Sequence, residues 1–367
     1  MSARLARRLP FVYGAMHAVV DASSAMVVFA AMRMHGIAFR EAFCFVVIYD
    51  LLAFALQVLI GAGTDKIRRP RGVLMAGLAL LSFGTLALSF EPYVAMVLVG
   101  VGNAAFHVGA GAISLRIEPR RATHAGIFVG PGALGLAFGI WFGKTGPAMA
   151  WPFTLGLSIA FVATLFLPDP EHPYEMQPEP APGDAQARAA ARTARPWLVV
   201  GLLLFSVLVR SVVGMAGSYR CPKQVVVIFT LASAAMMGKA LGGVVSDRLG
   251  WIETSVAALL LSAPLIAFGG SAWWVVAAGM FLFQMTMPVT LTALSIVFPS
   301  RPGLAFGLAS LALIVGALMT FSADVRALYG PWPFLALILL SAASMAAGLR
   351  LMGDLNPARG VLGRARS

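Results

Sequence analysis

The sequence predicts an all-α membrane protein whose twelve transmembrane helices form two related six-helix bundles. Three observations lead to this prediction: an apolar composition, twelve long apolar runs, and one short turn motif that occurs twice. The chain of 367 residues is 59% hydrophobic and only 11% charged, with a mean hydropathy of +0.86. This balance excludes an ordinary soluble domain.

The apolar runs have the length that a membrane requires, since a bilayer core of about 30 Å needs about 20 apolar residues per helix. They do not alternate in polarity, so helices fit better than barrel strands. The first run is too long for the core of a signal peptide and has no small-residue cleavage site, so we expect a retained helix. The twelve predicted spans are 10–32, 42–64, 72–90, 92–115, 124–143, 148–167, 197–217, 223–247, 252–269, 271–297, 303–322 and 331–351.

Basic residues set the predicted orientation. The net charge of +12 is explained better by the positive-inside rule than by nucleic-acid binding. Of the 27 Lys and Arg residues, 19 fall in segments on the side of the N-terminus. The sequence therefore predicts a multi-pass protein of a bacterial inner membrane with both termini in the cytoplasm. Six basic residues fall on the other side and two within helices: Arg33, Arg40, Lys144, Arg220, Lys223 and Arg326, then Arg210 and Lys239.

One long polar stretch divides the chain. Residues 169–196 are rich in Pro, Ala and Arg, which is typical of a linker. We therefore expect an N-terminal bundle at 1–168, a cytoplasmic linker at 169–196 and a C-terminal bundle at 197–367. Cys44 and Cys221 both fall near the predicted outer face, where either a disulfide or simple packing is possible.

The repeated turn comes after the second and eighth runs. GAGTDK begins at Gly61 and GVVSDR begins at Gly243, and each places a glycine four residues before an Asp and a basic residue. The motif resembles the loop signature of the major facilitator superfamily, although Arg68 stands where a glycine is usual. The resemblance implies gating, with each Asp capping a helix N-terminus and nearby arginines forming ion pairs. The alternative is ordinary topology-setting charge. The gating residues would be Gly61, Asp65, Lys66, Arg68, Gly243, Asp247 and Arg248.

Two further segments carry the resemblance. In the fifth run, Gly126, Gly130, Pro131 and Gly135 are similar to the glycine-proline signature of proton-coupled exporters, with Leu134 replacing one glycine. This implies close helix packing and a kink where the bundles meet, and it favours efflux. General small-residue packing is the alternative.

The fourth run departs from the exporters, because Met96 replaces an arginine that they often have. The pair Phe106 and His107, together with His17 and Asp21, resembles the fosmidomycin-resistance branch of the superfamily.

Ionisable residues at membrane depth are candidates for the site. Each costs at least about 2.5–3.5 kcal/mol on insertion scales, so it should face a partner or a wet cavity. Asp21, Asp50, Arg210 and Lys239 form a neutral set, which predicts pairing between the bundles. An alternative for Lys239 is a gate ion pair with Asp247, which lies two turns later.

Polar residues with helical spacing complete the candidates. His17 and Asp21 are one turn apart, which suits a proton relay or a buried hydrogen bond. Asn103 and His107 share a face of the fourth run, and Gln284 is the expected counterpart in the tenth. The predicted substrate or coupling residues are His17, Asp21, Asp50, Asn103, His107, Arg210, Lys239 and Gln284.

Methionine suggests an alternative cargo. Met236, Met237, Met280, Met285 and Met287 cluster in two predicted helices, and thioether ligands with imidazole would suit Cu(I). The same residues are common in soft packing. No arrangement of residues predicts an enzyme, a cofactor or a bound catalytic metal.

Together these features predict a secondary transporter that works by alternating access. It would move a small organic, anionic solute by proton coupling at His17 and Asp21 or at Asp50, with Arg210 attracting the anion. The expected partners are the bilayer, the substrate and protons, without nucleic acid, and we expect a monomer. The alternatives are copper or other metal uptake, and a non-transporting membrane sensor or assembly factor.

Overall fold

The computed structural model describes residues 3–147, 149–168, 196–327 and 329–354, and every regular element in these ranges is a helix. The first half comprises α1 (Ala3–Met34), α2 (Phe39–Asp50), the π-helix η1 (Leu51–Ala55), α3 (Gln57–Ile67), α4 (Pro70–Ala87), α5 (Pro92–Ser114), α6 (Ala122–Thr145) and α7 (Trp151–Phe166). The second half comprises α9 (Pro196–Tyr219), α10 (Val225–Leu249), α11 (Trp251–Phe268), α12 (Trp273–Gln284), α13 (Met287–Val297), α14 (Pro302–Met319), α15 (Ala323–Ala327) and α16 (Pro331–Asp354).

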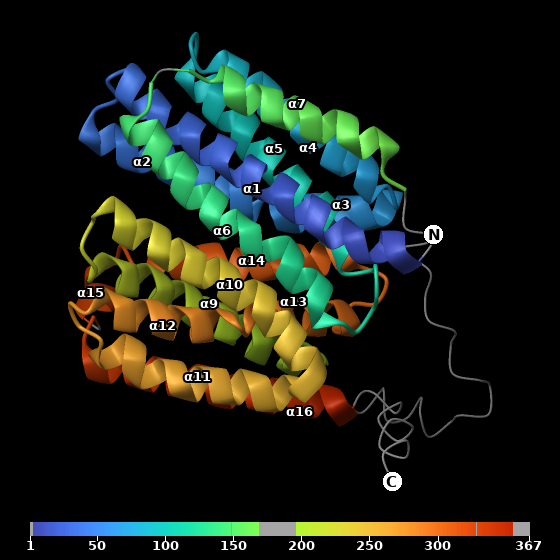
Figure 1. Ribbon diagram of the computed structural model, residues 1–367, viewed down its shortest axis with the longest axis vertical. Coiled ribbons are helices and arrows are strands. Elements are labelled where there is room, and N and C mark those ends of the chain that lie inside the picture. Colours follow the sequence, from blue (N-terminus) through green and yellow to red (C-terminus); the bar gives the residue numbers. More distant parts are fainter. Residues whose placement is uncertain (1–2, 148, 169–195, 328, 355–367) are drawn as a thin grey trace.

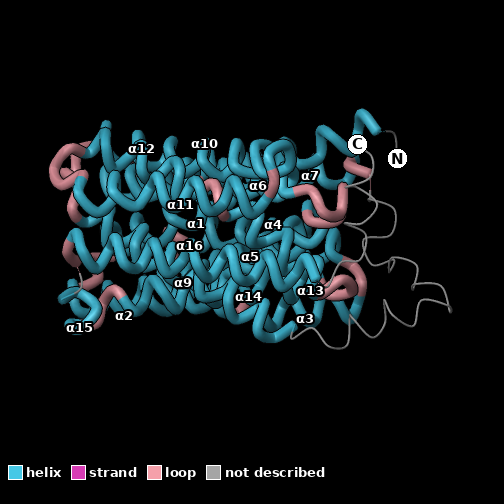
Figure 2. The backbone as a smooth tube through the Cα atoms, turned by 90° about the horizontal axis from the view of Figure 1, so that it is seen from below, coloured by secondary structure: helices cyan, strands magenta, loops and turns pink. Residues whose placement is uncertain are grey.

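The long helices lie side by side and their loops gather at two opposite ends (Figure 2). Figure 1 shows α1–α7 on one side of the molecule and α9–α16 on the other. Within the described residues, eleven spans are long and apolar enough to cross a membrane, and Trp151–Phe166 is a shorter apolar helix. Each of the twelve predicted runs thus corresponds to one helix or one interrupted helix. The predicted linker, 169–196, lies outside the described residues except for Pro196, the first residue of α9.

Two spans are interrupted. The second passes from α2 through η1 into α3, so a π-helix follows Asp50 directly. The tenth breaks at Met285 and Thr286, and α13 restarts at Met287 with Pro288 in its first turn. Proline has no N–H to donate and disfavours helical geometry in the residue before it, which explains the restart there. Sequence periodicity had indicated neither interruption.

Contacts between the halves use small residues. Helix α6 packs along α10, and α3 packs along α14. A Cβ atom at Gly126 would collide with the carbonyl oxygen of Lys239, and one at Gly303 would lie 2.9 Å from the carbonyl oxygen of Gly61. Two helix backbones can approach this closely only where glycine faces the partner.

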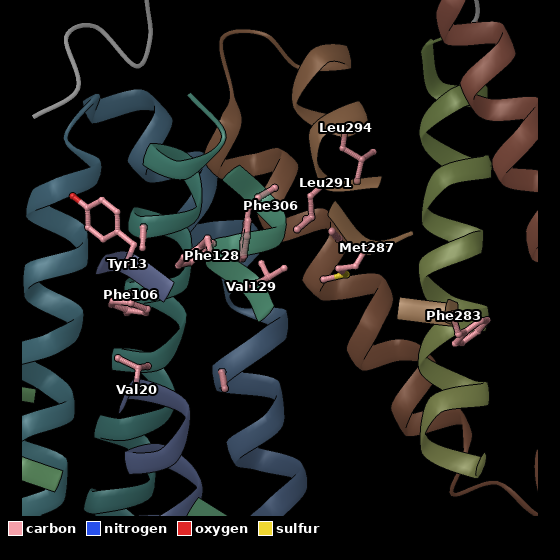
Figure 3. Packing of buried hydrophobic residues seen from close by; sticks show 14 of the residues in the cluster. Tyr13, Val20, Phe106, Phe128, Val129, Phe283, Met287, Leu291, Leu294 and Phe306 are labelled. Atoms are coloured by element: carbon pink, nitrogen blue, oxygen red, sulfur yellow. The ribbon is translucent and has the colours of Figure 1, made fainter. Parts of the chain in front are cut away.

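Large apolar side chains fill the space around these contacts. Phe128 of α6 and Phe306 of α14 come from different halves and lie next to each other, with ring centroids 6.0 Å apart (Figure 3). Both are almost fully buried. Cys44 and Cys221 are free thiols, the first exposed and the second buried, so the two do not form a disulfide in this structure.

Candidate functional site

Two histidines and one aspartate meet between α1 and α5. The Nε2 atoms of His17 and His107 are 2.7 Å apart. The carboxylate of Asp21 lies 3.1 Å from His17 Nε2 and 3.5 Å from His107 Nε2. His17 and Asp21 are one turn apart on α1, as their spacing predicted.

Backbone carbonyls orient both imidazole rings. His17 Nδ1 lies 2.9 Å from the carbonyl oxygen of Phe128, and His107 Nδ1 lies 2.9 Å from that of Asn103. A carbonyl oxygen only accepts, so each Nδ1 carries the proton and donates it. In neutral rings, both Nε2 atoms then present lone pairs to each other and to Asp21.

Asn103 and Gly132 complete the N-terminal half of the site. The side-chain amide of Asn103 donates to Asp21 over 3.3 Å and to the hydroxyl of Ser24 over 3.2 Å. Gly132 of α6 leaves room for the cluster, because a Cβ atom there would lie 2.6 Å from the Asp21 carboxylate and would collide with His17. Both histidines and Asn103 are buried, whereas the Asp21 side chain remains 17% exposed.

Two cations belong to the C-terminal half. Arg210 of α9 is 4% exposed and donates to the Thr286 hydroxyl over 3.2 Å and to the Met287 sulfur over 2.8 Å. The break between α12 and α13 places these two acceptors beside it. Lys239 of α10 lies within electrostatic range of Arg210, Asp21 and His107.

The predicted pairing of Asp21 and Asp50 with Arg210 and Lys239 is wrong for this structure. Among the described residues, neither acid forms a salt bridge with either cation, and Lys239 does not pair with Asp247. The reason lies in the partners that each group has instead. Imidazoles and an amide surround Asp21, helix N–H groups bind Asp247, and neutral acceptors bind Arg210.

Asp50 and Gln284 lie apart from this cluster. Asp50 is the last residue of α2, before η1, and no hydrogen bond or ion pair to its carboxylate occurs within the described ranges. Tyr49, its neighbour, lies within electrostatic range of both Asp50 and Asp21. Gln284 packs its Cβ against Gly238 of α10.

The two aspartates of the repeated motif cap helices across the halves. Asp65 of α3 accepts the N–H groups of Gly303 and Leu304, at the start of α14, over 2.9 and 2.8 Å. Asp247 of α10 accepts those of Ala122 and Thr123, at the start of α6, over 2.9 Å each. Capping was predicted, but the crossing between the halves was not. The end of the molecule that carries both caps is called the Asp65/Asp247 face below.

The residues around these caps explain the rest of the motif. Arg68 has φ = +55° and Gly250, at the equivalent place in the second copy, has φ = +105°. Left-handed backbone geometry favours glycine, so the glycine that is usual at this place in the signature resembled by the motif has a conformational reason. Lys66 and Arg248 are exposed. Asp247 also accepts from the hydroxyl of Thr123 and the indole of Trp251, so neutral donors replace the arginines that we had expected there.

The glycine-proline segment packs against two helices, α10 and α1. Gly126 and Gly130 lie against the backbone of α10, in the other half, while Gly135 lies against Ala18 of α1. Pro131 lies close to Gly14 of α1 and lines an apolar cavity of about 550 Å³. Phe153 and Phe229 are among the other residues that line this cavity, so it lies beside α6 rather than at the histidine cluster.

Sequence reasoning missed several partners. Ser310 of α14 donates to Gln57 of α3 over 2.6 Å, a buried hydrogen bond between the halves. An uncharged Gln in an apolar run was the available signal for it. Ser24 and Gly132 carried no such signal, because small residues are common in membrane helices.

Comparisons with known proteins give the fold. No family model and no curated protein matches the sequence. Among solved structures, the human organic anion transporter MFSD10 (TETRAN) is similar, with a TM-score of 0.68 and 16% identity over 96% of this chain and 100% of that one. A variant of the E. coli fucose:proton symporter FucP has a TM-score of 0.64 and 12% identity, over 95% of this chain and 98% of its own.

A further structure belongs to the same type of protein. The major facilitator superfamily transporter FucP in the outward conformation matches with a TM-score of 0.64 and 11% identity, over 95% of this chain and 98% of that one. At such identities the likeness shows the fold alone. The predicted fold class, two six-helix bundles of the major facilitator type, is confirmed.

Proposed function

We propose that this chain, whose fold is that of the major facilitator transporters, is a secondary transporter of a small organic anion. Its two halves would alternate between states that open the site to one side of the membrane and then to the other. The comparisons that support this proposal include an organic anion transporter and a proton symporter.

One observation carries the choice of an anion: Arg210 is buried at membrane depth without an acidic partner in the described structure. Its contacts are a hydroxyl and a thioether, which do not neutralise a guanidinium. A buried charge in a membrane protein is expected to meet a counter-charge. Lys239 adds a second positive charge within electrostatic range of Arg210. A carboxylate or similar anion bound at Arg210 would supply that counter-charge.

The two helix caps that join the halves suggest what stabilises one of these states. With Asp65 on α14 and Asp247 on α6, the helix ends of the two halves are tied together at one face. Opening that face would separate four backbone N–H groups from their carboxylates. The substrate would then have to favour the open state to reverse the equilibrium.

Asp50 is our proposal for the coupling carboxylate. Unlike Asp21, which an amide and two imidazoles contact, Asp50 has no described partner and adjoins a π-helix, a feature that often marks functional sites. An ionisable side chain within a membrane span is a functional candidate by default, and a carboxylate can carry a proton. The proton relay expected at His17 and Asp21 stays a prediction, as does the resemblance to the fosmidomycin-resistance branch.

Export is the direction that we propose, on the strength of the glycine-proline segment at Gly126 to Gly135. The alternative functions predict different results in binding and flux measurements. A copper importer would bind Cu(I) in place of organic anions, and a sensor or assembly factor would keep partner binding without solute flux.

The test is a binding screen on purified protein followed by flux in proteoliposomes. Organic anions, organic cations and Cu(I) would be compared by thermal shift, because a ligand of the folded state raises its apparent stability. We expect an anion to stabilise the native chain and Arg210→Gln to lose that shift. Arg210→Lys should keep part of it, since the charge remains.

Two further variants separate the role of the Arg210 charge in binding from general effects of losing an arginine and from proton coupling. Arg326→Gln removes an exposed arginine and should bind normally. Asp50→Asn should still bind the anion but lose the stimulation of flux by a pH gradient. Normal binding and transport by Arg210→Gln would contradict the anion assignment.

A further inference from the structure

We propose that His17, Asp21 and His107 form a binding site for one divalent transition metal ion of the zinc class. This goes beyond the proposed transport of an anion, because it concerns a second ligand at a different set of side chains. The one ligand atom that each residue offers lies within 4.8 Å of the other two.

The orientation of the rings is the first argument. Each Nδ1 donates to a backbone carbonyl, so the two Nε2 atoms face each other 2.7 Å apart with their lone pairs inward. The Asp21 carboxylate adds further electron density at 3.1 and 3.5 Å. Three converging electron-pair donors repel one another unless a proton or a metal ion lies among them, and the three ligand atoms leave room for one such ion.

The outer contacts match those of a metal site. Metal-binding histidines usually donate their second ring N–H to a carbonyl or carboxylate, which fixes the tautomer. Phe128 and Asn103 supply those carbonyls here. The amide of Asn103 also contacts Asp21, so all three ligands are held by neighbouring groups.

The distances need only a small adjustment. With metal–nitrogen bonds of about 2.0–2.1 Å and tetrahedral angles, two nitrogens are about 3.3 Å apart. The two Nε2 atoms would therefore separate by about 0.6 Å from their present 2.7 Å. We expect rotation of the two side chains to supply this separation.

The ligand types select the metal. Two imidazoles and one carboxylate suit Zn²⁺, Co²⁺ and Ni²⁺, whereas Cu(I) prefers sulfur. None of the three ligands is a sulfur atom, and the Met287 sulfur contacts Arg210. With three protein ligands the fourth position stays open to water. The side-chain oxygen of Asn103, a buried acceptor without a hydrogen-bond partner in the described structure, could bind that water.

The experiment measures the metal directly, on full-length protein without a histidine tag. Titration with Zn²⁺ in a calorimeter should give one ion per chain. Co²⁺ should produce visible absorption bands of a four-coordinate complex. His107→Gln and Asp21→Asn should each lower the affinity for Zn²⁺ by about tenfold to 100-fold. His107→Cys should keep a site with altered Co²⁺ bands, since thiolate is also a zinc ligand.

His35→Gln is the matched control, because His35 lies outside the cluster and contacts the carbonyl of Leu88. It should bind zinc as the native chain does. Helical circular dichroism and a single elution peak establish that each variant is folded. Stoichiometric binding that survives both His17→Gln and His107→Gln would overturn the proposal, as would the absence of binding in the native chain. Neither result depends on flux, so the proposed transport function stands or fails separately.

Discussion

At the residue scale, the histidine cluster depends on a position without a side chain. Gly132 of α6 faces His17 and Asp21, so the cluster fits only because α6 has no Cβ there. The neighbouring glycine, Gly135, allows α6 to approach Ala18 of α1 in the same way. The ionisable residues of α1 therefore depend on the glycines of α6 for the space that they occupy.

Gly132→Ala should lower the stability of the folded protein by about 1–3 kcal/mol, the usual effect of overpacking. The added methyl group must displace His17 or Asp21. Thermal unfolding in detergent would measure the change. Gly201→Ala is the matched control, because a Cβ atom at Gly201 meets no neighbour within 4 Å. That variant should be unchanged or more stable by up to about 1 kcal/mol, and equal midpoints for the two variants would contradict the packing argument.

The buried thiol gives a second prediction at this scale. Burial raises the pKa of Cys221, so less thiolate is present at neutral pH and reaction with maleimides is slow. In a Cys44→Ser variant we expect no maleimide adduct at pH 7 in the native state and one adduct after unfolding in SDS. Mass spectrometry of the intact chain would count the adducts. Rapid labelling of the native variant would show that Cys221 is accessible.

At the scale of elements, helix N-termini of one half are bound by carboxylates of the other. The first N–H groups of a helix lack partners within the helix, and the helix dipole favours negative charge there. Asp65 and Asp247 meet both requirements, for α14 and α6 respectively. Because each cap joins two halves, it stabilises a particular arrangement of the halves as well as a helix.

Asp65→Asn and Asp247→Asn should each destabilise the state that is closed at the Asp65/Asp247 face by about 1 kcal/mol relative to the open state. The ratio of closed to open molecules would then fall roughly fivefold. Spin labels at Arg69→Cys and Leu249→Cys, in a background without native cysteines, would report the distance between the halves. The double variant should populate a longer distance.

Glu118→Gln is the control for that experiment. It removes an ion pair with Arg121, three residues away in the same half, and should leave the distance distribution unchanged. An unchanged distribution in the double aspartate variant would reduce the repeated motif to a topology signal.

At the scale of the whole molecule, the first turn of α1 and the last turn of α16 lie at the same end (Figure 1). This agrees with an even number of spans. The excess of basic residues in the segments on that side predicts which end faces the cytoplasm.

Reporter fusions after Arg195 and after Arg366 should therefore both give a cytoplasmic signal. A fusion after Gly36, in the loop that follows α1, should give a signal on the opposite side. Alkaline phosphatase and fluorescent-protein fusions would measure this pair of outcomes. An external signal from Arg195 or Arg366 would contradict the predicted orientation.

Local rules were enough to predict much of this protein. Hydropathy predicted the number and order of the helices, since the bilayer fixes how long an apolar helix must be. The repeated motif predicted the helix caps, and helical spacing predicted that His17 would meet Asp21 and that Asn103 would share a face with His107. Each of these predictions rests on residues near one another in the sequence, whereas the helices that Asp65 and Asp247 cap are distant in the chain and were not predicted.

Tertiary structure decided which distant groups meet. Asp21 contacts His107 rather than Arg210, because the crossing of α1 and α5 brings the N-terminal polar residues together. Thr286 and Met287 reach Arg210 because Pro288 interrupts the tenth span. Charge neutrality of the four membrane-depth ions suggested a different pairing, since a sequence gives the charges but not the distances between helices. Partner choice at membrane depth follows from those distances.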